Sequence, residues 1–259
     1  MARTERTAAV VLRSVAYGES DRILTILTES HGKVAVMARG ARKSSRRFGG
    51  ALEPYALIEA DFAPGRGDLG RLAEARLVRA FPGVLTDLTR MSVAAAGLEL
   101  VREALPDREA PDPRLLPTVV RFFELCERLG TDALRFAFAL RVLAIAGLSP
   151  NLSSCGRCGL EAPEGRAALF DARLGAVVCR GCGGGPYKIG GRLRSSLARA
   201  ATGAWEQIAE EDWPDVERAA AQRVLDAFLE RHLGRRLAGG DVLSQVREVQ
   251  RSHARRINE

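Results

Sequence analysis

The sequence predicts an α+β fold in which a strand-rich first third precedes a largely helical remainder. Short apolar segments rich in β-branched residues recur over residues 1–80, and apolar residues at helical spacing dominate afterwards. Four cysteines in two pairs interrupt the helical part. With 259 residues, of which 46% are hydrophobic, the chain is long enough for two domains with buried cores. We therefore predict one domain over 1–80, a second over 81–149 together with 187–259, and an insertion over 150–186.

The first 80 residues contain five predicted strands. KVAVMAR alternates most clearly, with Val34 and Val36 on one side and Ala35 and Met37 on the other. Polar or glycine-containing turns separate the five segments, which cover residues 7–15, 21–28, 33–39, 55–62 and 71–81. Five short strands with one long basic loop indicate a small β-barrel of the OB type, and a β-sandwich is the alternative.

Helical patterns begin after Pro82. Residues 85–105 place apolar side chains on one face, and two further apolar helices end at Gly130 and Gly147, as expected where glycine follows a helix. From about residue 191 the chain is helical again, and the segment 213–233 carries an apolar stripe. This part of the chain is therefore predicted to be all-α.

The cysteine pairs have the spacing of a metal site. Cys155 and Cys158 are separated by two residues, as are Cys179 and Cys182, and glycines adjoin both pairs. Each such pair can present two thiolates to one tetrahedral ion, so we predict a closed, structural four-cysteine zinc ribbon. A redox pair or two disulfides are the alternatives, and Cys126 is predicted to be a separate core thiol.

The formal net charge of +7 is unevenly distributed. Residues 1–80 carry a net charge of +5, and residues 150–199 carry another +5. The remaining segments are close to neutral, so the excess is concentrated in two regions. Such segregation indicates a surface for a polyanion, most often a nucleic acid.

A basic loop follows the third predicted strand. Arg39, Arg42, Lys43, Arg46 and Arg47 fall within nine residues that contain no acidic residue. Glycines and serines between them would let the backbone approach phosphates, and three nearby aromatic residues could stack on bases: Phe48, Tyr55 and Phe62. The loop is predicted to bind single-stranded nucleic acid, and a solvated loop that serves solubility is the alternative.

Signals of catalysis and of membrane insertion are weak. The sequence contains no G-x4-G-K-[ST], H-E-x-x-H or G-x-S-x-G motif, and its three histidines are scattered. No apolar run of about 18 residues is present, and the N-terminal residues do not read as a secretory signal. We therefore expect a cytoplasmic protein that is not an enzyme and does not enter a membrane.

These parts, in this order, resemble the RecO family of bacterial recombination-mediator and DNA-annealing proteins. The resemblance covers nearly the whole chain. Its most specific pieces are YGESD at 17–21, the T-x-x-x-G-K turn that ends at Lys33 and is soon followed by ARGARK, and the cysteine spacing. LRFAFALRVLAIAGLSPNLSSCGRCG, GAVVCRGC and RHLGRRLAGGDVL match further family segments. We add Lys33 to the predicted DNA-binding residues.

The resemblance implies an N-terminal OB domain, a helical domain and an inserted zinc ribbon that holds one structural Zn²⁺ per chain. It implies no enzyme activity. The implied function is to bind single- and double-stranded DNA and to anneal complementary strands. With RecR, such a protein would also help load RecA onto DNA coated by the single-strand-binding protein SSB. Such a protein would be associated with the nucleoid.

The resemblance also implies that SSB is engaged through its acidic, hydrophobic C-terminal tail, so the partner site should be an apolar pocket with a basic rim. The candidates for this pocket are Arg121, Phe122, Arg135, Phe136 and Arg141. Basic residues of the cysteine region could extend the DNA path, namely Arg157, Arg166, Arg173, Arg180, Lys188, Arg192 and Arg194. A zinc-ribbon RNA-binding or transcription factor, or a zinc enzyme, remains an alternative.

Overall fold

The computed structural model describes residues 4–65, 67–107 and 112–257, with side chains described up to residue 253. The chain divides into two compact units. Unit 1 comprises 1–86 and 101–127, and unit 2 comprises 87–100 and 128–259. Helix α2 (Leu88–Ala104) contributes to both. The structure thus groups 101–127 with the strands, whereas the predicted domains assign this segment to the helical part.

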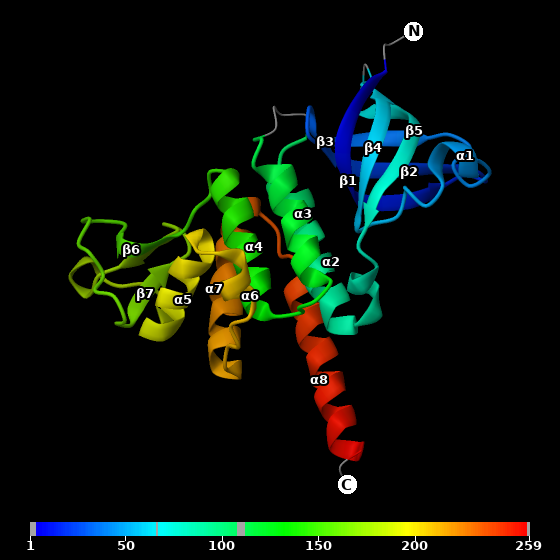
Figure 1. Cartoon of the computed structure of the whole chain (residues 1–259). Coiled ribbons are helices and arrows are strands. Elements are labelled where there is room, and N and C mark those ends of the chain that lie inside the picture. The colour runs from blue at the N-terminus through cyan, green and yellow to red at the C-terminus, as the bar shows by residue number, and fades with distance from the viewer. Residues whose placement is uncertain (1–3, 66, 108–111, 258–259) are drawn as a thin grey trace. The chain divides into compact units, whose positions relative to one another are not determined.

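Five strands of unit 1 form a closed barrel (Figure 1). They are β1 (Glu5–Tyr17), β2 (Asp21–Thr28), β3 (Gly32–Ala38), β4 (Ala56–Ala63) and β5 (Leu69–Ala80). The order around the barrel is β1-β2-β3-β5-β4, and every pair is antiparallel except β3 with β5. This five-stranded closure confirms the predicted OB-like barrel and removes the open sheet edges that a sandwich would keep.

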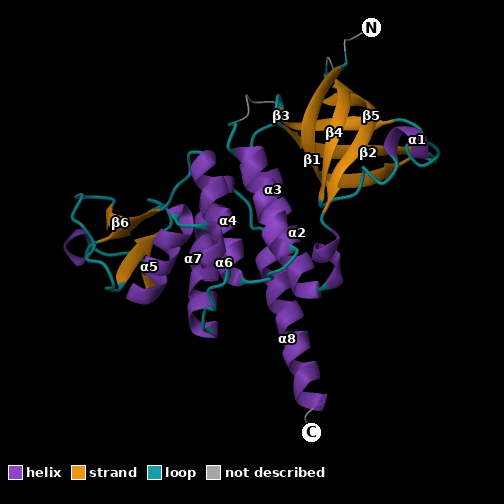
Figure 2. Cartoon of the chain, in the orientation of Figure 1, coloured by secondary structure: helices purple, strands orange, loops and turns teal. Residues whose placement is uncertain are grey.

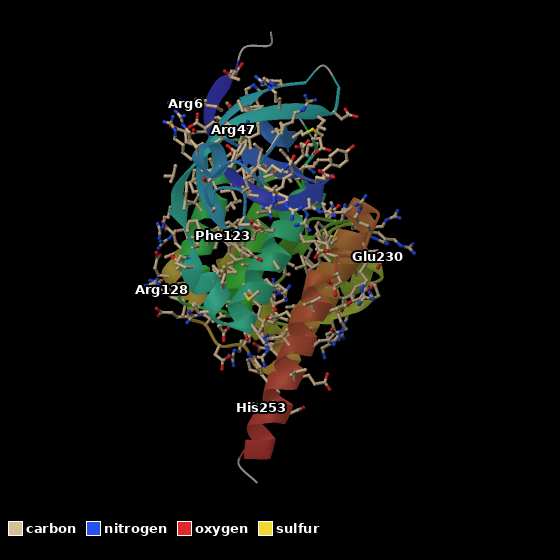
Figure 3. All side chains as sticks on the ribbon, turned by 90° about the vertical axis from the view of Figure 1, so that its right-hand side faces the viewer. Arg6, Arg47, Phe123, Arg128, Glu230 and His253 are labelled. Carbon is tan, nitrogen blue, oxygen red and sulfur yellow. The ribbon has the colours of Figure 1, made fainter. Side chains whose placement is uncertain are left out.

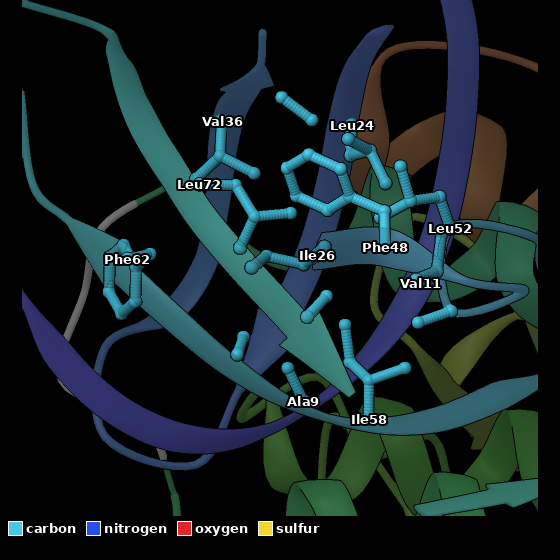
Figure 4. Close-up of a cluster of buried hydrophobic side chains, with 14 of the residues drawn as sticks. Ala9, Val11, Leu24, Ile26, Val36, Phe48, Leu52, Ile58, Phe62 and Leu72 are labelled. Carbon is cyan, nitrogen blue, oxygen red and sulfur yellow. The ribbon is translucent and has the colours of Figure 1, made fainter. Parts of the chain in front are cut away.

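Alternate residues of the strands point into the barrel and form its core (Figure 4). Leu24, Ile26 and Val36 are fully buried there, as the alternation of the second and third predicted strands requires. The short helix α1 (Ser45–Phe48), which was not predicted, adds Phe48 to the same core. An aromatic side chain directly after the basic loop therefore packs in the barrel interior.

Helix α3 (Leu115–Cys126) covers part of the outside of unit 1. Its Phe123 ring lies edge-on to Tyr55, with the centroids 5.7 Å apart, and is tilted against Phe81 at 5.4 Å. Arg79 on β5 forms an ion pair with Glu124 of the same helix at 2.5 Å. These aromatic contacts explain why this helix belongs with the barrel rather than with the other helices.

Unit 2 consists mainly of helices and a small sheet (Figure 2). The helices are α4 (Asp132–Ile145), α5 (Gly191–Thr202), α6 (Trp205–Ala209), α7 (Asp215–Leu233) and α8 (Gly239–Ile257). The Thr131 hydroxyl accepts a hydrogen bond from the Leu134 amide at 3.2 Å and so caps α4. Within the described residues, no helix combines the length and the apolar character that crossing a bilayer requires.

The sheet of unit 2 lies where the zinc ribbon was predicted. Its strands are β6 (Asn151–Cys155), β7 (Ala168–Asp171), β8 (Ala176–Val178) and β9 (Tyr187–Ile189), in the order β6-β8-β7-β9. Gly175 has a φ of 61° in the turn before β8, as expected for the tip of the predicted hairpin. Short 3-10 helices occur at Pro82–Thr86 and Arg180–Cys182.

Candidate metal centre and nucleic-acid interface

The four predicted cysteine ligands converge on one point. The sulfur atoms of Cys155, Cys158, Cys179 and Cys182 all lie within 4.8 Å of one another. The Cys158 and Cys179 sulfurs are 3.8 Å apart. Sulfur–metal distances of about 2.3 Å in a tetrahedral site imply sulfur–sulfur separations of about 3.8 Å, whereas a disulfide needs about 2.05 Å. The donor set therefore fits a metal ion, and all five cysteines of the chain are free thiols.

Backbone turns position the two cysteine pairs. Cys155 ends β6, and the Gly159 amide returns to its carbonyl at 2.9 Å. The Cys182 amide bonds the Cys179 carbonyl at 3.0 Å, directly after β8. Between the pairs the packing is close, because a Cβ added at Gly156 would lie 2.6 Å from the Ala176 Cβ. The glycine at this position is therefore a steric requirement of the knuckle.

The pKa values of two thiols in the cluster shift in opposite directions. Backbone amides, first that of Cys179, lower the pKa of Cys155 to about 6. Hydrogen bonds among the thiols, first with Cys179, raise the pKa of Cys182 to about 12. Without a cation the site therefore favours a thiolate at Cys155 and a proton at Cys182. A bound metal ion would stabilise all four thiolates, which is the chemistry a structural site uses.

Arg194, a buried residue of helix α5, holds the ribbon through hydrogen bonds to its backbone. The Arg194 side chain donates hydrogen bonds to the carbonyl oxygens of Leu152 at 2.7 Å and of Arg166 and Ala162 at 3.1 Å, and also to that of Pro163. Only 5% of Arg194 is exposed, so it cannot extend a DNA path. The prediction for Arg194 was therefore wrong, whereas the other six basic residues predicted in this region are exposed.

Replacing Arg194 with alanine should loosen the ribbon. The change leaves several carbonyl oxygens without their charged donor, and hydrogen bonds to charged groups contribute roughly 1.5–3 kcal/mol each. We expect the free energy of unfolding to fall by at least about 3 kcal/mol, measured by urea unfolding. The control is Arg192→Ala on the same helix, where the exposed side chain has only a 3.6 Å ion pair with Glu217 and should cost under about 1 kcal/mol. Equal losses in both variants would contradict this role.

The basic loop, residues 39–47, comprises the segment that follows β3 and the start of α1, which contains Arg46 and Arg47, and its five predicted cations are all exposed. Figure 3 labels Arg47 on unit 1. Among the described residues, no acidic side chain forms an ion pair with any of the five. The positive charge of Arg39, Arg42, Lys43, Arg46 and Arg47 is therefore not neutralised within unit 1.

Hydrogen bonds hold this loop against the β1–β2 turn. The Gly40 amide donates to the Asp21 carboxylate at 2.8 Å, and the Arg42 amide donates to the Ser20 carbonyl at 3.0 Å. The Arg47 guanidinium donates to the Arg39 carbonyl at 2.9 Å. The backbone of the loop is thus fixed while its cationic side chains face solvent.

Several residues predicted beside this loop have other roles. Phe48 and Phe62 are buried in the barrel core, and Tyr55 packs on Phe123, so none of the three is an exposed stacking partner. The Lys33 side chain is only 10% exposed. It donates to the Arg102 carbonyl and lies 3.2 Å from the Asp107 carboxylate. Lys33 therefore has a structural role, and we do not retain it in the DNA-binding surface.

The structure brings together two of the five residues predicted for a partner pocket, because the Arg135 guanidinium lies over the Phe136 ring at 4.2 Å. Arg121 and Phe122 belong to unit 1, where Phe122 is fully buried. In unit 2, Phe136 is buried and stacks on Trp213 at 5.2 Å. Arg141 lies over the Trp205 ring at 3.8 Å and donates to the Ala200 carbonyl. Of the five, Arg135 alone lines the cleft described next.

A polar cleft of about 560 Å³ opens between α4, α7 and α8 within unit 2. Its lining includes six arginines, namely Arg135, Arg218, Arg223, Arg236, Arg247 and Arg251, and five acidic residues, namely Asp132, Asp215, Asp226, Asp241 and Glu248. Sequence reasoning missed this cleft, although the spacing of Arg247 and Arg251 places both on one face of a helix. Helices α7 and α8 follow each other in the chain, but α4 ends at Ile145, far before α7 begins at Asp215.

Arg135 occupies a special position in this cleft. Burial lowers its pKa to about 10, and its Nε atom is buried without a hydrogen-bond partner. An adjoining apolar cavity of about 30 Å³ is also lined by Arg135, together with Leu225 and Phe138. The arginine therefore separates a polar opening from an apolar recess.

These features define a class of protein: an OB-like barrel with an exposed cationic loop, joined to a helical unit that carries a four-cysteine knuckle. Two family models match the chain. The model described as Recombination protein O N terminal covers residues 1–81, and the one described as Recombination protein O C terminal covers residues 85–239.

Curated relatives agree with both models. The chain is 40% identical over 247 residues to the DNA repair protein RecO of Anaeromyxobacter sp. (strain K), covering 93% of this chain and 96% of the relative. It is 39% identical to the DNA repair protein RecO of Myxococcus xanthus over 92% of this chain and 96% of that protein. For the protein of the same name from Geobacter sulfurreducens the identity is 37%, with coverages of 93% and 98%. The chain belongs to the RecO family of DNA repair proteins.

Proposed function

We propose that this chain is a non-catalytic recombination mediator that binds single- and double-stranded DNA and anneals complementary strands. With RecR it would help load RecA onto DNA coated by SSB, in the cytoplasm and on the nucleoid. The observation that carries the proposal is the anchored basic loop, whose five exposed cations have no acidic partner among the described residues. Cations of this kind neutralise phosphates without reading sequence, as annealing of arbitrary strands requires.

We assign Zn²⁺ as the ion held by Cys155, Cys158, Cys179 and Cys182. Four thiolates favour a closed tetrahedral site that keeps no position for water or substrate. When bound, the ion supplies folding free energy rather than catalysis. The ribbon in turn exposes Arg157, Arg180 and Lys188, which offer a second cationic surface for DNA.

The cleft around Arg135 is the proposed site for the acidic, hydrophobic tail of SSB. Tail carboxylates could accept hydrogen bonds from the arginines that line the cleft, and the adjoining cavity of about 30 Å³ would have to widen to admit an apolar side chain of the tail. The arginines at the mouth of the cleft would attract the acidic residues of the tail. Of the five predicted partner residues, this assignment retains Arg135. It does not include Arg121, Phe122, Phe136 or Arg141.

A double variant of the cleft mouth tests this assignment. Arg223→Ala with Arg251→Ala should weaken binding of an SSB-tail peptide by roughly tenfold, because the rim loses the charge of Arg223 and that of Arg251, which would exchange its 2.6 Å ion pair with Asp215 for a carboxylate of the tail. Fluorescence anisotropy of the labelled peptide measures the effect. Arg231→Ala, an exposed position on α7 outside the cleft lining, should leave the affinity unchanged. An unchanged affinity in the double variant would exclude the cleft as the tail site.

The proposed function itself is tested by annealing of complementary strands that have been coated with SSB. We expect the protein to accelerate annealing without any nucleoside triphosphate, and an excess of RNA should compete poorly. If annealing is not accelerated and RNA is bound in preference to DNA, the alternative of an RNA-binding or transcription factor replaces this proposal.

A further inference from the structure

Unit 1 exposes a single one of its described aromatic side chains, Tyr17 at the end of β1. Its exposed fraction is 54%, whereas the aromatic side chains predicted to stack on bases are engaged elsewhere. Sequence reasoning placed the aromatic partners after the basic loop. The structure offers an aromatic side chain before the loop, on β1, which β2 separates from the strand that leads into the loop.

Tyr17 belongs to a largely apolar row on the outer face of β1, β2 and β3, in which its own cross-strand partner is the acidic Asp21. Val15 lies opposite Ile23, and Ile23 lies opposite Met37 on the next strand. These side chains point outward because Leu24, the next residue along β2, points into the core. Tyr17 is two residues beyond Val15 and therefore faces the same way. Val15 is exposed, and Ile23 and Met37 are half-buried.

Positive charge borders this row. Arg13 is exposed two residues before Val15 on β1, and the exposed Arg71 on β5 pairs with Met37. At the other end of the row, Arg39 follows β3 directly and begins the basic loop. The row is thus an apolar strip between cations.

The basic loop and Tyr17 are linked through one residue. Asp21 is the cross-strand partner of Tyr17, and its carboxylate accepts the hydrogen bond from the Gly40 amide at 2.8 Å. The same turn holds the Arg42 backbone through Ser20. The exposed ring and the exposed cations therefore sit on one fixed scaffold.

We propose that Tyr17, with the outward row of Val15, Ile23 and Met37, is a stacking surface for the bases of a single strand whose phosphates contact the basic loop. The proposal rests on the proposed function and extends it from phosphates to bases. Charge complementarity selects the occupant, because a strip of apolar groups bordered by arginines matches a polyanion with exposed planar faces. A duplex does not offer those faces, since its bases are stacked inside.

The test compares two oligonucleotides of equal length, one of deoxythymidine and one of abasic sites. Tyr17→Ala should bind the thymidine strand roughly tenfold more weakly and the abasic strand as the wild type does. The dependence of affinity on salt should not change, because no cation is removed. Tyr17→Phe should keep the affinity of the wild type, and Val78→Ala, at an exposed position on β5 outside the row, is the matched control.

The outcomes separate this proposal from the proposed function. If Tyr17→Ala binds thymidine strands normally while Arg42→Ala with Lys43→Ala binds them weakly, the stacking surface is excluded and the phosphate-binding loop stands. An equal loss on thymidine and abasic strands would also overturn the proposal, since the effect would not involve bases. A loss of RecR binding with unchanged DNA affinity would make the row a protein interface. If neither variant affects DNA binding, both proposals are wrong.

Discussion

Alanine at both Arg42 and Lys43 is expected to weaken binding of single-stranded DNA and to reduce its dependence on salt. Each phosphate contact to a single strand contributes about 0.7 to the slope of log affinity against log salt concentration. Loss of two contacts should therefore make the slope shallower by about 1.4. Fluorescence anisotropy with a labelled oligonucleotide, repeated over a series of salt concentrations, measures both effects.

The matched control for this pair is Arg6→Ala with Arg76→Ala. It removes the same charge from the same barrel at positions that are already neutralised, since Arg6 pairs with Asp61 at 2.8 Å and Arg76 with Glu74 at 2.9 Å. We expect its affinity and slope to match those of the wild type. If the control and the loop variant behave alike, DNA responds to the overall charge and the loop is not a binding site.

Removal of the metal is expected to unfold the ribbon while the barrel stays folded. Metal binding by such cysteine sites contributes on the order of 10 kcal/mol in model peptides, and the ribbon has only four short strands of its own. Amide hydrogen exchange after treatment with a chelator should show lost protection over residues 151–189 and retained protection over β1–β5. The barrel thus serves as an internal reference.

Cys179→Ser should reproduce this loss and abolish stoichiometric zinc. Cys126→Ala is the control, because Cys126 is buried in α3 and lies outside the cluster, so its removal should leave one zinc per chain. Protein that contains no zinc as purified, yet keeps a protected ribbon, would contradict the metal assignment.

Local patterns predicted much of the fold. The alternation of residues 33–39 corresponds closely to β3, and the apolar helix predicted to end at Gly147 corresponds to α4. The cysteine spacing identified all four members of the cluster, because each pair is set by one short turn. In these cases the residues that determine the structure are close together in the sequence.

Long-range packing determined what sequence reasoning missed. Phe48 reads as a loop residue, yet it fills the barrel interior because β1–β5 close around it. Lys33 and Arg194 read as surface cations, yet both side chains are largely buried and donate to backbone carbonyls of distant segments, Lys33 to one and Arg194 to several. The Arg135 cleft needs three helices to meet. The local periodicity of a sequence does not predict such contacts between distant segments.

The most direct test of the account is a photochemical crosslink between the protein and a single strand that contains 4-thiothymidine, mapped by mass spectrometry. We expect crosslinks within residues 39–47 of unit 1, the loop whose cations are exposed and unneutralised. Crosslinks confined to unit 2, with none in the barrel, would contradict it.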